Sequence, residues 1–137
     1  MNPNYIFTIT LYSCQRAADS PDKKEHWKRT ILRNCFWKSE TAVTQLGSQA
    51  APNNTYIVRI PINPDYRSYA EWNESMQGFT ISNGDLIILG ECLEEITGEN
   101  GHTAAQILKQ NKPNAFKVTA FSDNTEFLLG KHYRAGG

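Results

Sequence analysis

The run Leu86-Ile87-Ile88-Leu89 constrains the fold of this chain more than any other feature. Successive side chains of a β-strand point to opposite faces of a sheet, so a strand that is apolar at every position needs cover on both sides. The turn signal Ser82-Asn83-Gly84-Asp85 stands directly before this run and sets where the strand begins. We therefore expect a central strand at residues 86–89.

The rest of the chain supplies partners for such a strand. Most of these stretches are rich in β-branched and aromatic residues, and the clearest alternate apolar and polar side chains, which favours strands. In chain order they are Tyr5–Tyr12, Trp27–Trp37 with a bulge or bend at Asn34, Thr55–Ile62, Phe116–Phe121 and Phe127–Tyr133. In the third stretch Tyr56, Val58, Ile60 and Ile62 share one face, and Pro61 marks a sheet edge or exit.

One convincing helix is expected, over residues 103–110. Thr103 is a suitable N-terminal cap, and Pro113 stops the helix. Residues 39–54 look like a weak strand followed by an exposed loop, and residues 63–78 show no period and read as a long loop. The fold class is thus mainly β: a small β-barrel or sandwich of six to seven strands with one short helix and long loops, in a single domain over 1–137. A closed barrel with the helix plugging one end would cover both faces of residues 86–89.

Composition excludes several classes of protein. With 39% hydrophobic and 11% aromatic residues the chain is of the globular kind, and no apolar run reaches the length that crosses a bilayer. The first residues lack the basic flank and apolar stretch of a signal peptide, so we expect folding in a cytoplasm and no membrane partner. Cys14, Cys35 and Cys92 are widely spaced, which indicates reduced thiols and neither a disulfide framework nor a zinc site.

No set of residues has the spacing of a catalytic or metal site. His26, His102 and His132 are far apart and have no ligand-spaced cysteine, histidine or carboxylate beside them. Glu94 and Glu95 are adjacent, and adjacent residues of a strand point to opposite faces, so they would not share an acid–base site. The sequence predicts a protein that is not an enzyme and that has no cofactor or metal.

Residues 63–78 carry the first candidate site. Four large side chains stand there in a polar setting: Tyr66, Tyr69, Trp72 and Met76. Tryptophan and tyrosine dominate binding energy at protein interfaces, so these residues are candidate interface anchors. The alternative is that Trp72 folds back as a lid over the end of the barrel. Truncation of the loop separates the two, because a lid is needed for folding and an anchor only for assembly.

The second candidate site is basic. Lys28, Arg29 and Arg33 lie on a predicted strand near aromatic residues, as in the single-strand-binding surface of an OB-like domain. The formal net charge of zero argues against nucleic-acid binding as the main function. The charge is also divided along the chain: residues 1–69 hold nine Lys/Arg and five Asp/Glu, and residues 70–137 hold five and nine. A solvated surface explains this division, and so does a basic face that meets the acidic face of a neighbouring copy.

The order of these segments resembles a family of small proteins of tailed phages and prophages, the minor capsid or head–tail connector (head-closure, neck) proteins. The segments that carry the resemblance are Thr8–Tyr12, Cys35-Phe36-Trp37, Val58-Arg59-Ile60-Pro61, Trp72, Asn83–Gly90, Phe116–Asn124 and His132-Tyr133-Arg134. They cover most of the chain, each is short, and their order carries the match.

The resemblance implies a structural virion protein in the neck of a phage, assembled in the bacterial host cytoplasm. Such a subunit would form a homo-oligomeric ring of roughly six or twelve copies between the portal or adaptor and the tail proteins, in non-specific contact with packaged DNA. Residues 39–54 and 63–78 would make the contacts along the axis and between rings, and Lys28 and Arg29 would face DNA or a neighbouring ring. Two alternatives stay open: a minor capsid or tail-terminator protein, and an OB-like single-stranded nucleic-acid-binding or host-interaction protein.

Overall fold

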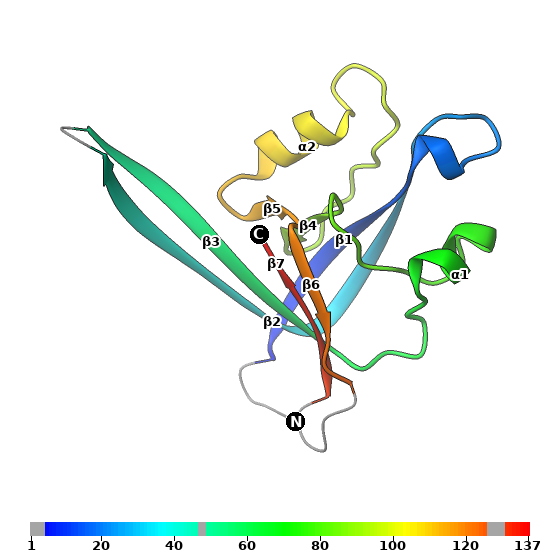
Figure 1. Cartoon of the computed structure of the whole chain (residues 1–137), viewed down its shortest axis with the longest axis horizontal. Coiled ribbons are helices and arrows are strands. Elements are labelled where there is room, and N and C mark those ends of the chain that lie inside the picture. Colours follow the sequence, from blue (N-terminus) through cyan, green and yellow to red (C-terminus); the bar gives the residue numbers. More distant parts are fainter. Residues whose placement is uncertain (1–4, 47–48, 126–130) are drawn as a thin grey trace.

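The computed structural model of this chain describes residues 5–46, 49–125 and 131–137, with the backbone alone over 41–46 and 49–53. Seven antiparallel strands form one sheet in the order β5-β4-β1-β2-β3-β7-β6, which curls into a half-barrel (Figure 1). Two short α-helices and a 3-10 turn, η1 (Ala17–Asp19), complete the described part. The expected fold class, mainly β with six to seven strands, is confirmed.

Strands β1 (Phe7–Gln15) and β2 (His26–Leu46) form the first hairpin of the sheet. Their register runs from Gln15 opposite His26 to Phe7 opposite Cys35, with a shift between Phe7 and Ile9. Asn34, which lies opposite this shift, has a φ of 59°, a left-handed conformation that asparagine adopts more readily than other non-glycine residues. The bulge or bend expected at Asn34 is confirmed.

Strand β3 (Gln49–Pro61) pairs with β2 on one side and with β7 (His132–Gly136) on the other. Strand β6 (Ala120–Asp123) pairs with β7 and lies at the edge of the sheet. Tyr56, Val58 and Ile60 are buried on the inner face of β3, as their alternation predicts. Ile62 was expected to join them and is 57% exposed, because β3 ends at Pro61 and the chain leaves the sheet there.

Strand β4 (Leu86–Leu89) lies between β1 and β5 (Ala115–Lys117), with apolar cover on both faces. Ile87 faces the main core inside the curl, and Leu86 and Ile88 face a second cluster on the opposite side. Helix α2 (Ala104–Asn111) contributes its buried Ile107 to that second cluster. The central position of β4 is confirmed, but α2 covers the outer face of the sheet and does not plug a barrel end.

The two edge strands of the sheet, β5 and β6, are consecutive in the chain. Only Val118 and Thr119 separate them, and the backbone N–H of Val118 donates to Asp85 beside β4 while that of Thr119 donates to Gly136 of β7. One continuous segment, residues 115–123, therefore leaves one end of the curled sheet and joins the other end. The single closed barrel expected from the sequence is replaced by this arrangement, in which the segment changes partners midway.

Helix α2 begins as predicted. Thr103 and Gln106 form a capping box, in which each side chain accepts a hydrogen bond from the other residue's backbone N–H. The prediction of a long loop at 63–78 is wrong in part, because residues Tyr69–Ser75 form a second helix, α1. Only Trp72 of α1 is buried, so the helix shows no apolar period in the sequence.

The β2–β3 hairpin extends well beyond the rest of the sheet. Strand β1 pairs with β2 only as far as Cys35, and β7 pairs with β3 only from Ile57 onward, yet β2 and β3 stay paired with each other to Leu46 opposite Gln49. At about 3.3 Å per residue the stretch from Glu40 to Leu46 spans roughly 20 Å. Residues 40–46 and 49–55 form an arm that projects away from the body (Figure 1). In place of the weak strand and loop expected at 39–54, residues 39–46 and 49–54 form a regular two-stranded ribbon, and residues 47 and 48 lie outside the described part.

Candidate functional site

Trp72 is part of the interior of the protein. Its side chain is 0% exposed, on the buried side of α1, and the Tyr69 ring lies 6.1 Å away. The helix is also tied to β1, since the Gln15 amide donates to the backbone and side-chain oxygens of Asn73. The structure therefore corrects the interface-anchor prediction for Trp72 and favours the alternative, in which it folds back onto its own chain.

The remaining aromatic and sulfur candidates of this region also contact their own chain. The Tyr66 ring packs 4.2 Å from that of Tyr133 and is half-buried. The Tyr69 hydroxyl donates to Asp19 and accepts from the backbone N–H of Arg16. Met76 ends α1 with a φ of 54°, and its carbonyl accepts from Lys28. Tyr66, Tyr69 and Met76 hold residues 63–78 onto the body, and all three side chains stay partly exposed.

The basic candidates on β2 are paired within the chain. Arg29 contacts Glu95 at 3.0 Å and donates to the Cys92 carbonyl, Arg33 lies 3.7 Å from Glu91, and the Lys28 ammonium donates to a backbone carbonyl. A phosphate backbone binds by displacing counterions from unpaired lysines and arginines. Two carboxylates offset the charges of Arg29 and Arg33, so the strand is a weaker DNA-binding surface than the sequence alone indicates.

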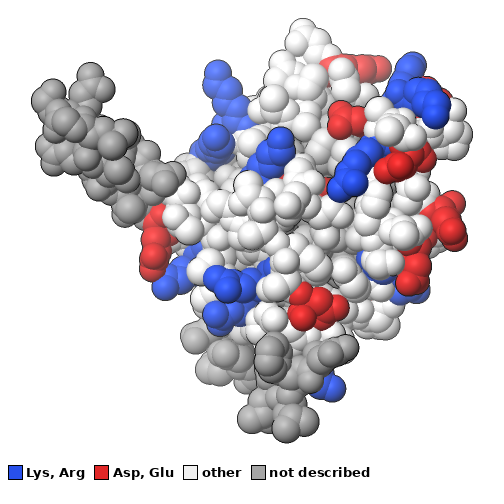
Figure 2. All heavy atoms as spheres, viewed as in Figure 1, with Lys and Arg blue, Asp and Glu red and all other residues white. Residues whose placement is uncertain are grey.

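These ion pairs also bear on the uneven charge of the two halves. Arg29 and Arg33 belong to the basic half of the sequence, and their partners Glu95 and Glu91 belong to the acidic half. On the face drawn in Figure 2, blue and red side chains are interspersed and do not form separate basic and acidic surfaces. Some of the opposite charges of the two halves therefore pair with each other within one molecule.

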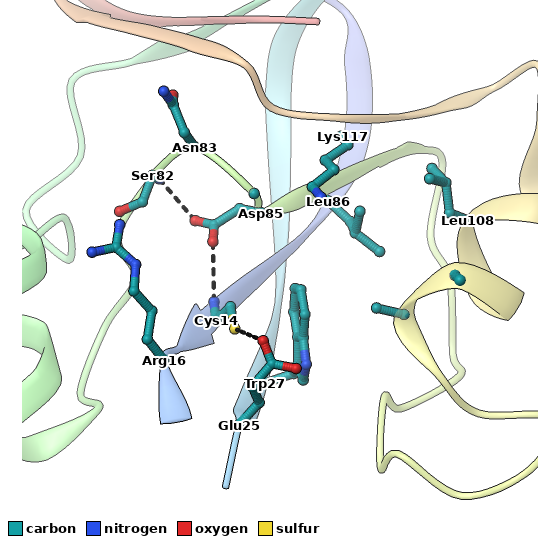
Figure 3. A pocket seen from close by; sticks show the side chains of 13 residues that line it. Cys14, Arg16, Glu25, Trp27, Ser82, Asn83, Asp85, Leu86, Leu108 and Lys117 are labelled. Carbon is teal, nitrogen blue, oxygen red and sulfur yellow. Dashed lines mark hydrogen bonds between the residues drawn. The ribbon is translucent and has the colours of Figure 1, made fainter. Parts of the chain in front are cut away.

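A cavity of about 420 Å³ lies between the ends of β1 and β2, the turn before β4 and the first half of α2 (Figure 3). It is lined by Cys14, Arg16, Glu25, Trp27, Ser82, Asn83, Gly84, Asp85, Leu86, Ala104, Ala105, Leu108 and Lys117. The Asp85 carboxylate is 1% exposed and accepts hydrogen bonds from the backbone N–H groups of Ser82 and Cys14. Burial raises its pKa to about 7, and the two N–H groups oppose that rise. Asp85 thus fastens the turn to the end of β1.

The cavity holds no activated nucleophile. Burial and, to a smaller extent, the neighbouring Glu25 carboxylate, which accepts a hydrogen bond from the Cys14 thiol at 3.7 Å, together raise the pKa of this thiol to about 12. A thiol acts as a nucleophile through its thiolate, which Cys14 does not form near neutral pH. Among the residues whose side chains are described, no three His, Cys, Asp or Glu lie close enough together to hold a metal ion.

The arm at residues 40–55 is the feature that the sequence prediction missed. It does carry a signal in the sequence: the 18 residues from Thr41 to Val58 include no Asp, Glu, Lys, Arg or His, in a chain that is 20% charged. A solvated hairpin is ordinarily protected by charged residues along its edges. An uncharged ribbon that leaves the body is a candidate surface for another protein.

Both edges of the arm lack a neighbouring strand in the part of the chain that the structure describes. The outer edge of β2 has no β partner after Cys35, and the outer edge of β3 has none before Tyr56, whose backbone exchanges two hydrogen bonds with Gly137. A strand edge without a neighbouring strand offers backbone N–H and C=O groups to a further strand. An isolated two-stranded hairpin is only marginally stable in water, so a partner on either edge would stabilise the arm.

The fold and these surfaces define a small, mainly β protein with one curled sheet and a projecting hairpin. The chain belongs to a family of unknown function (DUF6751), whose model matches residues 6–137. No curated protein and no solved structure matches this chain. Within the described residues, neither helix approaches the length and apolar character of a membrane span.

Proposed function

We propose that this protein is a structural subunit of a tailed-phage virion, a head–tail connector that forms a ring between the portal or adaptor and the tail. The observation that carries the proposal is the projecting arm. A subunit of a ring must reach its neighbours, and an uncharged ribbon with two unpaired edges is suited to lie against another protein without desolvating charges. The order of sequence segments that resembles the phage neck proteins supports the same role.

The body of the protein supports a scaffolding role for the sheet. Fifteen buried residues of the described part form the main core inside the curl, and a second cluster under α2 covers the outer face of the sheet at β1, β4 and β5. Such a body is a rigid base from which an arm can act. The uneven charge of the two halves supports the ring less than the sequence indicates, because Arg29 and Arg33 have carboxylate partners in their own chain.

Electron microscopy of a lysate tests this proposal. The gene is deleted from a phage that carries it, and a matched lysate is complemented with the gene in trans. Free tails beside heads that have lost their DNA are the expected result for a head-closure subunit. Full, stable heads without tails would move the protein to an adaptor or tail-side joint. Normal infectious particles would overturn the neck assignment and favour the nucleic-acid-binding alternative.

A further inference from the structure

We infer that the arm of one copy adds as a strand to the exposed edge of β6 in a second copy, so that the sheet continues from subunit to subunit. This inference rests on the proposed function, since it names the partner of the arm within the assembly. It joins two features of the same chain: an uncharged ribbon that needs a strand partner, and a sheet edge that offers one.

Strand β6 is the available edge. It is one of the two outermost strands of the sheet and pairs only with β7 among the described strands. Ala120, Ser122 and Asp123 are exposed, while the Phe121 ring packs 6.1 Å from that of Tyr66 and fixes the strand to the body. A rigid edge of this kind can receive a strand with little loss of its own conformational entropy.

The surface beside this edge fits an uncharged guest. An open groove of about 380 Å³ runs over the outer face of β3, β7 and β6, and most of its side chains are small or uncharged: Thr55, Ile57, Ala120, Ser122 and Gly136. Arg134 is the charged residue that lines it. A Cβ on Gly136 would meet the Tyr56 carbonyl oxygen at 3.2 Å, so the floor of the groove is backbone.

The geometry assigns the arm and the edge to different copies. Strand β7 separates β3 from β6 in the sheet, and the arm leaves β3 in the direction away from the body (Figure 1). The β6 edge of the same molecule is therefore out of line with its own arm. When the arm of one copy binds the edge of the next and the contact is not returned, the interface is heterologous, and its repetition builds a ring or a filament. The net charge of zero adds no overall repulsion between copies.

One residue of β6 allows the edge to be blocked without breaking its bond to β7. The N–H of Asn124 donates to the His132 carbonyl, toward β7. N–H groups alternate in direction along a strand, so the N–H of Asp123 points outward. Asp123→Pro removes that donor and places a ring on the free edge, where proline is tolerated. Asp123→Ala is the matched control, because it removes the same carboxylate and leaves the N–H in place.

The test is complementation between two defective chains, with mass measured by light scattering and native mass spectrometry. One chain has Thr41–Asn54 replaced by Asn-Gly and keeps its edge; the other is Asp123→Pro and keeps its arm. We expect the wild type and Asp123→Ala to assemble, and each defective chain to associate at least about tenfold more weakly. Their mixture should give a one-to-one heterodimer that does not grow.

The results that contradict the inference are separate from those that contradict the proposed function. If Asp123→Pro assembles like the wild type while the arm-deleted chain does not, the arm binds elsewhere and the inference is overturned. The connector role survives that result. A wild-type chain that stays monomeric at millimolar concentration overturns the inference as well, and the micrographs of the deletion lysate then decide the function independently.

Discussion

Asp85 is a buried carboxyl group whose only described hydrogen bonds come from two backbone N–H groups. Burial raises its pKa to about 7, from about 3.9 in an unfolded chain. Between these values the folded protein binds a proton that the unfolded chain has released. The free energy of unfolding therefore falls by up to about 4 kcal/mol as the pH rises from about 4 to about 7. Above pH 7 this contribution no longer changes.

Urea unfolding at several pH values from 4 to 8 measures this dependence. Asp85→Asn cannot ionise, so the fall in unfolding free energy with rising pH should become clearly smaller than in the wild type. Asp65→Asn is the control, since Asp65 is an exposed carboxyl group outside the cavity. Equal slopes in the wild type and in Asp85→Asn would show that Asp85 does not titrate in this range.

Trp72 makes the second prediction at the scale of single residues. It is the largest fully buried side chain, so Trp72→Ala leaves a large cavity under α1 and should cost about 3–5 kcal/mol of unfolding free energy. Leu93→Ala removes a side chain that is 74% exposed and should change stability by less than about 0.5 kcal/mol. Chemical denaturation of both variants gives the comparison. A Trp72→Ala protein of wild-type stability would return this residue to the interface candidates.

The arm gives a prediction at the scale of an element. Replacing Thr41–Asn54 with Asn-Gly joins Glu40 to Thr55, which face each other in the register, through a two-residue turn of a favoured type. The core residues of the two described clusters all lie outside the replaced segment. The melting temperature, followed by circular dichroism, should therefore stay within a few degrees of the wild type.

Deletion of residues 68–76, which removes α1 and Trp72, should abolish cooperative unfolding, and survival of the fold would contradict the role assigned to this helix.

The same contrast explains which elements the sequence could predict. Strands β1, β3 and β4 have one or both faces buried, so their alternation or continuous apolar character is visible in the residues themselves. The start of helix α2 is visible in the sequence because Thr103 and Gln106 have the spacing of a capping box. Helix α1 buries one residue in seven and has no apolar stripe to read. The arm continues β2 after the last residue that packs on the body, where nothing requires alternation, and the only trace it leaves is a missing set of charges.

The candidate sites were harder to predict than the fold, for a physical reason. Residue types identify what a side chain can do, whereas its partner depends on tertiary contacts between distant segments. Arg29 and Glu95 are 66 residues apart in the chain and meet only because β1, β2 and β4 form one sheet. Trp72 looks like an anchor in a polar loop until its helix is placed. The aromatic and basic candidates therefore contact their own chain, and the sequence analysis did not identify the uncharged arm as a candidate.

At the scale of the whole molecule, the ion pairs predict weak binding to single-stranded DNA. With Arg29 and Arg33 already paired and a net charge of zero, few counterions are available for release. Fluorescence anisotropy with an oligonucleotide at rising salt should show no tight, steeply salt-dependent binding by the purified chain. A matched pair of variants, Arg29→Ala and Lys109→Ala, should be indistinguishable. Submicromolar binding that Arg29→Ala alone weakens would favour the OB-like alternative over the connector.

Strand β2 is a single piece of chain that serves both as a wall of the body and as one side of the arm. A pull on the arm is therefore delivered directly into the body, with no hinge loop between them. The load runs parallel to the β1–β2 and β3–β7 ladders, so their hydrogen bonds are strained together and must fail together. Tension of this kind meets far more resistance than peeling bonds one at a time. In the proposed assembly, tension between two copies would therefore load these two ladders in shear.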